Sequence, residues 1–269
     1  VAKKAVKRRV VKKAIKKKKL KWSAIDSKVK KVLLAKYQLG LNEAKTIDTY
    51  NITNDLNANT NQIRYETAVK TLTLLKTNNS NAFPVNAGSK IAYVGLGTAQ
   101  LNDFGRRLQD DLQADTYLFS YKDSSPRADS ILKAIREGGY SSVVIGVHEY
   151  SLRPANNYNF SEAALNLFGQ LQQFNSATFV FGNVLALSNF CAAKNLIACY
   201  QDDDITQHAA ADLLEGKIVS KGVLPVSVCE FKYGAGIVHA GIKPSAAVQK
   251  EKLNVIDSIA LDGIAQKAY

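Results

Sequence analysis

The sequence predicts an α/β protein, a three-layer α/β/α sandwich with a mainly parallel sheet, preceded by N-terminal helices. Two observations lead to this prediction. Five short runs rich in β-branched and aromatic residues alternate with stretches that carry the start and stop signals of helices. The strand-like runs are apolar over most of their length, as is typical of parallel strands covered on both faces. Right-handed crossovers would then place helices on both sides of one sheet.

The predicted strands and the helices between them are short. The strands are 90–97 (KIAYVGLG), 115–121 (DTYLFSY), 141–147 (SSVVIGV), 177–183 (ATFVFGN) and 195–201 (NLIACYQ). The helices between them are 99–112, 125–138 and 161–174. The second of these helices is the most clearly delimited, because Pro126 lies in its first turn and Gly138 and Gly139 mark its end.

The stretch 204–228 (DITQHAAADLLEGKIVSKGVLPVSV) closes the predicted sheet domain. Asp204 is expected to cap a helix, with Gln207 at the capping-box position. The body of this helix is rich in alanine, and small side chains let it lie close to the sheet. Pro225 has no N–H to donate, so the run 223–228 is predicted to be a strand at an edge of the sheet or at its own beginning.

The N-terminal part has a helical pattern without strands. One helix carries an apolar stripe of Val6, Val10 and Ala14, and a second is expected to begin at Ser23 and end at Gly40. The whole chain then divides into basic helices at 1–40, a linker with a lead-in helix (61–76) at 41–89, the α/β sandwich at 90–240, and a linker with the start of a further domain at 241–269.

The net charge of +13 is concentrated at the N-terminus. Residues 1–36 hold 16 of the 36 Lys and Arg and one acid, Asp26, so the rest of the chain is almost neutral. A nucleic-acid-binding domain usually spreads basic charge over a folded face, so no nucleic-acid partner is expected. No apolar run approaches the ~20 residues that span a bilayer. No signal-peptide pattern follows the basic start.

The cysteines do not have the spacing of a metal site. Cys191, Cys199 and Cys229 are odd in number and include no CxxC pair. Cys199 and Cys229 lie in strand-like apolar runs, where a free thiol behaves as a small apolar side chain. The three histidines are scattered along the sequence. Neither a metal nor a cofactor is therefore expected.

Four stretches resemble the C-terminal α/β sandwich domain of family 3 glycoside hydrolases. They are IDSKVKKVLLAKYQLGL (25–41), TLTLLKTNNSNAFPV (71–85), DDDITQHAAADLLEGKIVSKGVLPVSV (202–228) and FKYGAGI (231–237). The first is similar to the segment that leaves the catalytic barrel of that family, and the second to the start of its second domain. SLRPANNY (151–158) resembles the β-N-acetylglucosaminidase branch more than the β-glucosidase branch.

The resemblance implies that the catalytic residues lie outside this chain. Family members hydrolyse glycosides with retention, using a carboxylate nucleophile and a separate acid/base. Both lie in an N-terminal (β/α)₈ barrel in the β-N-acetylglucosaminidase branch, where a His–Asp pair supplies the acid/base. Neither motif occurs here, and residues 1–40 resemble only the end of that barrel. The chain begins at Val1 and has no methionine, so we expect a piece of a longer enzyme that is inactive alone.

The resemblance also implies partners and a location. The expected partners are the catalytic barrel of the same polypeptide and a carbohydrate substrate. The family resemblance favours a periplasmic or secreted bacterial protein. The tail LNVIDSIALDGIAQKAY (253–269) resembles the first helix of a serine β-lactamase-like domain, which follows family 3 modules in some bacterial fusions.

The loop after the third predicted strand is the candidate substrate-binding segment. Ligand-facing loops lie beyond the C-terminal ends of parallel strands, and this loop carries His148, Glu149, Arg153, Asn156 and Asn157. Arg153 is suited to orient a sugar hydroxyl or a carboxylate. The alternative is that Arg153, the proline after it and the two asparagines only shape a turn. By analogy with the β-glucosidase branch, Glu149 is also considered as a catalytic acid.

Three other functions fit parts of the sequence. They are a β-glucosidase-type member of the family, a non-catalytic carbohydrate-binding or scaffold module, and a dinucleotide-binding domain. The last rests on GLGTAQ (95–100), which follows a strand and precedes a helix. Against it, Gln100 replaces the third glycine of the fingerprint, and no acid follows the second strand until Asp123.

Overall fold

The computed structural model describes residues 11–43, 49–78, 82–86 and 88–238. The chain divides into two compact units, Val1–Leu56 and Asn57–Tyr269, and each is described by itself. Among the described residues, no helix has the length and apolar character needed to cross a membrane.

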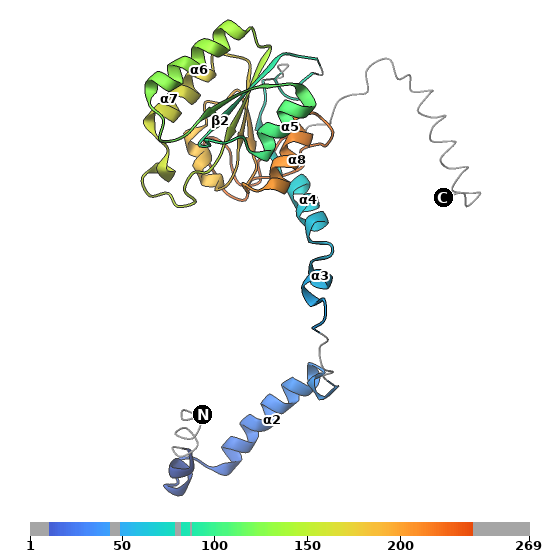
Figure 1. Cartoon of the computed structure of the whole chain (residues 1–269). Helices are drawn as coiled ribbons and strands as arrows, with labels where there is room; N and C mark the ends of the chain where they lie inside the picture. The colour runs from blue at the N-terminus through green and yellow to red at the C-terminus, as the bar shows by residue number, and fades with distance from the viewer. Residues whose placement is uncertain (1–10, 44–48, 79–81, 87, 239–269) are drawn as a thin grey trace, which may run out of the picture. The chain divides into compact units, whose positions relative to one another are not determined.

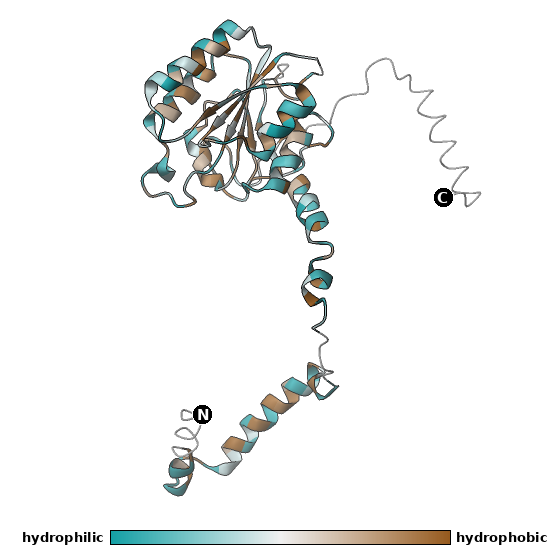
Figure 2. Cartoon of the chain, in the orientation of Figure 1, coloured by the Kyte–Doolittle hydropathy of each residue, from teal (hydrophilic) through white to brown (hydrophobic). Residues whose placement is uncertain are grey.

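Helix α2 (Trp22–Gln38) is the longest element of the first unit (Figure 1). It follows a helical stretch at 11–16 and precedes the 3₁₀ helix η1 (Leu41–Glu43), and the short helix α3 (Ile52–Asn57) crosses the boundary of the units. Lys21, not Ser23, occupies the N-cap, so Ser23 lies inside the first turn. None of the residues of α2 is buried. Apolar and polar residues are interspersed along the helix (Figure 2). The predicted stripe residues Val6 and Val10 lie outside the described residues.

The second unit is built on a six-stranded sheet in the order β1-β6-β5-β4-β2-β3. The strands are β1 (Thr73–Lys76), β2 (Ile91–Leu96), β3 (Asp115–Phe119), β4 (Ser142–Val147), β5 (Ser176–Val180) and β6 (Asn195–Ala198). Strands β2 to β6 pair in parallel, and β1 pairs antiparallel with β6. The mainly parallel sheet predicted from the strand–helix alternation is confirmed.

Helices cover both faces of this sheet. They are α4 (Thr60–Thr71), α5 (Asp103–Leu112), α6 (Ser125–Gly138), α7 (Glu162–Leu171) and α8 (Asp204–Leu214). Helices α6 and α7 pack together on one face, and α4 and α5 both pack against α8 on the other (Figure 1). The second unit is therefore the three-layer α/β/α sandwich that the sequence predicts.

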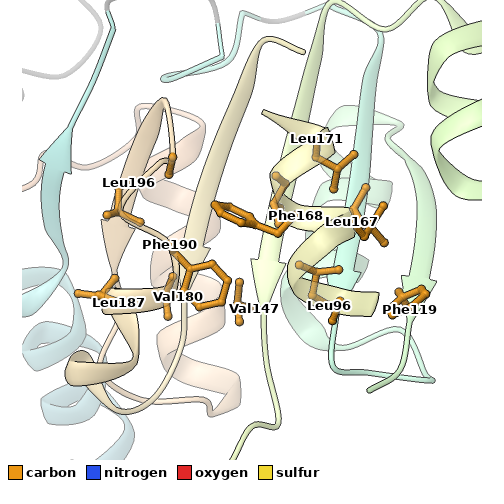
Figure 3. Close-up of a cluster of buried hydrophobic side chains, with 14 of the residues drawn as sticks. Leu96, Phe119, Val147, Leu167, Phe168, Leu171, Val180, Leu187, Phe190 and Leu196 are labelled. Carbon is orange, nitrogen blue, oxygen red and sulfur yellow. The ribbon is translucent and has the colours of Figure 1, made fainter. Parts of the chain in front are cut away.

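Each face of the sheet has its own apolar core. On the α7 side, Leu167, Phe168 and Leu171 of the helix join Val180 and Phe190 in one buried cluster (Figure 3). On the α5 side, buried aromatic rings dominate, among them Tyr93, Phe104, Phe179 and Phe181. Strands β2, β4, β5 and β6 are buried at every residue. Burial on both faces is why these strands lack polar alternation.

The sheet has β1 and β3 at its edges, and the presence of β1 corrects two predictions. The lead-in helix was expected to reach residue 76, but α4 ends at Thr71 and β1 follows it. The run 223–228, expected as the edge strand, is instead an irregular segment with a bend at 225–226 and one isolated bridge, from Val228 to Phe231. The physical reason is that 73–75 is fully apolar or β-branched and can be buried, whereas Pro225 cannot donate to a ladder.

Helix α8 begins with a different cap from the predicted one. Asp203, not Asp204, is the N-cap, and its carboxylate accepts the Thr206 N–H at 2.8 Å. Gln207 does not complete a capping box. Its side-chain oxygen accepts the backbone N–H of Phe104 at 3.0 Å, and its amide nitrogen points to the carboxylate that precedes the cap. Tertiary contacts with α5 thus take the glutamine away from its own helix end.

Cys191 and Cys229 form a disulfide across 38 residues, so the expectation that Cys229 is a free thiol is wrong. Cys199 is free and buried, as an apolar residue would be. The bridge forms because the turn from Val228 to Phe231 packs on the α7-side core. This packing brings Cys229 next to Cys191, which lies in the segment after β5. The spacing of the cysteines along the sequence carries no signal of that approach.

Candidate functional site

The C-terminal ends of the parallel strands carry a series of tight turns. The residues with left-handed backbone there are Gly97 (φ 97°) after β2, Glu149 (φ 51°) after β4, Gly182 (φ 107°) after β5 and Tyr200 (φ 62°) after β6. Residues other than glycine rarely adopt this region of φ and ψ, and those that do gather at functional sites. The predicted loop starts at one of them, Glu149.

His148 lies in the interior at the start of this loop, with 1% of its surface exposed. Its Nδ1 lies 2.9 Å from Oδ1 of Asp202, and its Nε2 lies 3.2 Å from the hydroxyl of Tyr93. The imidazole stacks on Phe181 with the ring centroids 4.4 Å apart. Both ring nitrogens are therefore occupied by protein groups, and His148 is placed to support the loop rather than to meet a ligand directly.

Asp202, which follows β6, receives three hydrogen bonds. Its Oδ1 accepts from His148 and, at 2.8 Å, from the side-chain amide of Gln207. Its Oδ2 accepts the backbone N–H of Glu149 at 2.9 Å. Burial acts to raise the pKa of Asp202, but the hydrogen bonds from His148, Glu149 and Gln207 outweigh burial and hold the pKa below its usual value.

Glu149 has a fixed backbone and a free side chain. Its N–H is held by Asp202 and its φ is left-handed, while the residue as a whole is exposed. Its carboxylate makes no hydrogen bond or ion pair with any residue that the structure describes. A charged group that is free at the end of a buried strand can meet a ligand without first breaking a contact.

The rest of the loop is closed by its own contacts. The Ser151 N–H donates to the carbonyl of Tyr158 at 2.9 Å, and the four residues 156–159 all have left-handed backbone. The side-chain amides of Asn157 and Asn189 exchange two hydrogen bonds, of 2.8 and 3.0 Å. The amide of Asn157 therefore helps to shape the turn, in line with the alternative considered for it.

Arg153 is exposed at the middle of the loop. Its backbone N–H donates to the hydroxyl of Ser151 at 3.1 Å, and its guanidinium has no ion-pair partner within the described part of the chain. Asn156 precedes the 3₁₀ helix η2 (Asn157–Asn159), and its side chain makes no capping bond. Of the five predicted residues, Glu149, Arg153 and Asn156 thus present side chains to solvent, and His148 and Asn157 support the loop.

Two further residues that hold the loop were not among the predicted ones. Asp202 anchors its start, and Asn183 anchors its middle, since the Asn183 side chain donates to the carbonyl of Leu152 at 2.8 Å. The Tyr150 hydroxyl donates back to the carbonyl of Asn183 at 3.1 Å. A signal existed in both cases, because Asn183 ends one predicted strand and Asp202 follows its neighbour, and the C-terminal ends of parallel strands share one edge of the sheet.

The glycine-rich turn after β2 is filled by the protein itself. A Cβ on Gly97 would collide with the carbonyl of His148, and one on Gly105 would meet the Tyr93 ring. Helix α5 begins with its own cap, because the Asn102 side chain accepts the Gly105 N–H at 2.9 Å. Asp103 adds a negative charge to the first turn. An anionic pyrophosphate would meet these groups, so the geometry does not favour a dinucleotide.

Within the described residues, no group of three or more His, Cys, Asp and Glu side chains is placed to hold a metal ion. The fold and the site define a class: an α/β/α sandwich that presents a polar loop, anchored by Asn183 and Asp202, at the C-terminal edge of its sheet. No protein-family model matches the sequence, and no curated protein matches it.

Solved structures share the fold. One is a fungal multi-domain family 3 β-N-acetylglucosaminidase with a GCN5-related glucosamine N-acetyltransferase region (TM-score 0.53, 18% identity, 88% of this chain and 26% of that chain). Another is a family 3 β-N-acetylglucosaminidase from a Paenibacillus species (TM-score 0.50, 16% identity, 79% of this chain and 41% of that chain). A third is a β-glucosidase from Listeria innocua, in complex with laminaribiose (TM-score 0.58, 18% identity, 80% of this chain and 34% of that chain). The chain thus spans well under half the length of these enzymes.

Proposed function

We propose that this chain is the C-terminal sandwich domain of a retaining family 3 glycoside hydrolase that acts on β-N-acetylglucosaminides. The observation that carries the proposal is the shared fold, which extends over 79% and 88% of the chain in two β-N-acetylglucosaminidases. The order of the four resembling stretches along the sequence supports it independently. The catalytic nucleophile and acid/base belong, in this proposal, to a barrel encoded upstream.

In this function the first unit supplies the end of the barrel. Helix α2 buries none of its residues, and Val32, Leu33 and Tyr37 are each more than half exposed. Apolar area of this kind gains roughly 25 cal/mol for each Å² removed from water. Packing against the rest of a barrel would provide that burial.

In the same function the second unit lends its loop to the substrate cleft. Arg153 and Asn156 carry free polar side chains beyond β4, where open parallel sheets bind ligands. Arg153 has donors suited to a sugar hydroxyl or to the acetamido oxygen of the substrate.

The β-glucosidase branch is the second candidate function, and Glu149 favours it. Its carboxylate is free and exposed at the end of β4, as a catalytic acid supplied by this domain would need to be. The likeness to the Listeria β-glucosidase is of the same order as that to the β-N-acetylglucosaminidases. A scaffold role without any ligand is a further alternative and predicts no effect of loop substitutions on activity.

The disulfide supports a location outside the reducing cytosol. Disulfides persist mainly in secreted and periplasmic proteins. The Cys191–Cys229 bridge therefore agrees with the periplasmic or secreted location that the family resemblance favours. The proposed β-lactamase-like domain after residue 253 falls outside the described residues and stays a prediction.

Activity measurements on two proteins test the proposal. We expect the 269-residue chain to release no nitrophenol from nitrophenyl β-N-acetylglucosaminide or β-glucoside, because it lacks both catalytic motifs. The complete gene product is expected to hydrolyse the N-acetylglucosaminide, with Arg153→Ala raising KM. Turnover of the glucoside alone, abolished by Glu149→Gln, would favour the second candidate. Turnover by the 269-residue chain would contradict both.

A further inference from the structure

The backbone of Glu149 is held by a carboxylate far away in the sequence. The Glu149 N–H donates to Oδ2 of Asp202 at 2.9 Å. Glu149 itself is exposed and has a left-handed φ of 51°. A left-handed glutamate persists only where the surroundings impose it. The hydrogen bond to an ionised acceptor is the stronger kind, and it fixes the direction in which the chain leaves β4.

Asp202 is itself held from the side facing the interior. The buried His148 and the nearly buried Gln207 both donate to its Oδ1, at 2.9 and 2.8 Å. Gln207 is fixed in turn by the Phe104 N–H, and the His148 ring is fixed by its stack on Phe181. The carboxylate is therefore oriented before any loop residue contacts it.

The hydroxyl of Tyr121 adds a second tie at the same point. It donates to the carbonyl of His148 at 2.9 Å, so both the C=O and the N–H of the peptide group that joins His148 to Glu149 are hydrogen-bonded. The far half of the loop has separate anchors in Asn183 and in the Asn157–Asn189 pair. Loss of Asp202 would consequently release the first residues of the loop and leave the rest in place.

We propose that Asp202, oriented by His148, is a positioning residue that sets the direction of Glu149 toward the carbohydrate substrate. The substrate in this statement rests on the proposed function, whereas the positioning does not. Asp202 acts through the peptide N–H of Glu149 and touches no reacting atom. Its contribution is to fix the loop before the substrate binds.

Asp202→Asn tests the positioning because it alters one contact of the three. The amide keeps an oxygen for His148 and Gln207 and places its NH₂ opposite the Glu149 N–H. The matched control is Asp203→Asn, which removes the same charge one residue later and keeps a good N-cap for α8. Amide hydrogen exchange of the 269-residue chain, followed by NMR, is the measurement.

We expect Asp202→Asn to speed exchange of the Glu149 amide about tenfold or more, the effect of losing a hydrogen bond to a charged group. Exchange in β2, β4 and β5 should stay within about twofold, and the control should leave Glu149 unchanged. A merely structural role would instead speed exchange throughout the sheet. Unchanged exchange at Glu149, or an equal effect of the control, would overturn the proposal.

The wild-type chain provides a measurement that does not depend on the folding of a variant. The exposed Glu149 amide should exchange as slowly as amides in the middle of β4, and rapid exchange there would also overturn the positioning. In the complete enzyme, Asp202→Asn should lower kcat/KM. The melting temperatures of the Asp202→Asn and Asp203→Asn variants should be similar to each other. If Asp202→Asn abolishes the slow exchange of the Glu149 amide but leaves kcat/KM unchanged, the positioning stands and the result counts against the proposed function alone.

Discussion

At the scale of single residues, Gly146 makes the polar network beneath the loop possible. It lies in β4, directly opposite Gly95 of β2. A Cβ built on Gly146 would lie 2.8 Å from the hydroxyl of Tyr93 and closer still to the His148 ring. The missing side chain therefore leaves the space in which His148 and Tyr93 meet.

Gly146→Ala is expected to destabilise the second unit by about 1–3 kcal/mol, the usual cost of overpacking a core. The backbone of β4 accepts alanine, so the cost arises from the displaced rings. The control is Gly169→Ala in α7, where an added Cβ meets nothing within 4 Å. That substitution should stabilise by about 0.5–1 kcal/mol. Urea unfolding measures both, and a neutral Gly146→Ala would show that the rings move aside freely.

At the scale of elements, an ion network on the outer side ties α5 to α8 and α4. The Arg107 guanidinium of α5 contacts Asp212 of α8 at 2.9 Å and Asp111 of its own helix at 2.8 Å. Asp212 also accepts the Tyr65 hydroxyl of α4 at 2.7 Å. Burial and this hydrogen bond raise the pKa of Tyr65 to about 12, so the tyrosine stays a donor at all moderate pH values.

Arg107→Ala is expected to cost about 1–3 kcal/mol, because it leaves partly buried, hydrogen-bonded carboxylates without their partner. The neighbouring Arg106 provides the control, since among the residues that the structure describes its guanidinium pairs with Asp103 of the same helix alone, and its side chain is 57% exposed. Arg106→Ala should change the free energy of unfolding by no more than about 0.5 kcal/mol. Equal effects in chemical denaturation would mean that the network contributes no more than a surface ion pair.

At the scale of the whole molecule, the sequence predicted the layers correctly and missed one edge strand of the sheet, β1. Period and composition identify β2, β4, β5 and β6, because burial on both faces makes them apolar throughout. β1 was missed because Thr73–Lys76 continues the preceding helix without a proline or glycine. Whether residues 73–76 form a helix or a strand depends on their pairing with β6, which is distant in the sequence. The local sequence pattern does not encode that pairing.

The candidate site was predictable in place and only partly in composition. The rule for parallel sheets located the loop after β4 from the sequence alone. It did not separate the supporting residues from the exposed ones, because that depends on which side chains face inward. The position of His148 after β4 predicted a contact with ligand. In the structure His148 is buried, and its ring stacks on Phe181. Asp202 was passed over, since its partner Glu149 lies 53 residues away.

The stability of the second unit is expected to fall in acid more steeply than ordinary carboxylates would require. The pKa of Asp202 is lowered from 3.8 by its hydrogen bonds, and the pKa of the cap Asp203 is lowered by bonds from Thr206 and Arg64 that outweigh its burial. A carboxylate with a depressed pKa in the folded state contributes stability that is fully present above the unfolded value. That contribution is lost as the pH falls through the folded value.

Glu215 acts in the opposite direction, because burial raises its pKa and so favours the folded state on acidification. Asp111, whose pKa the hydrogen bond from Arg107 lowers, acts in the same direction as Asp202 and Asp203, and these three carboxylates should outweigh Glu215 below about pH 4, the ordinary value for Asp. Urea unfolding at pH 6 and pH 3 should therefore show a smaller loss of free energy on acidification for Asp202→Asn than for the wild type. The charge that is protonated in acid is already absent in the variant. Equal losses in both proteins would show that Asp202 titrates alike in the folded and unfolded states and that its three hydrogen bonds do not favour the ionised form.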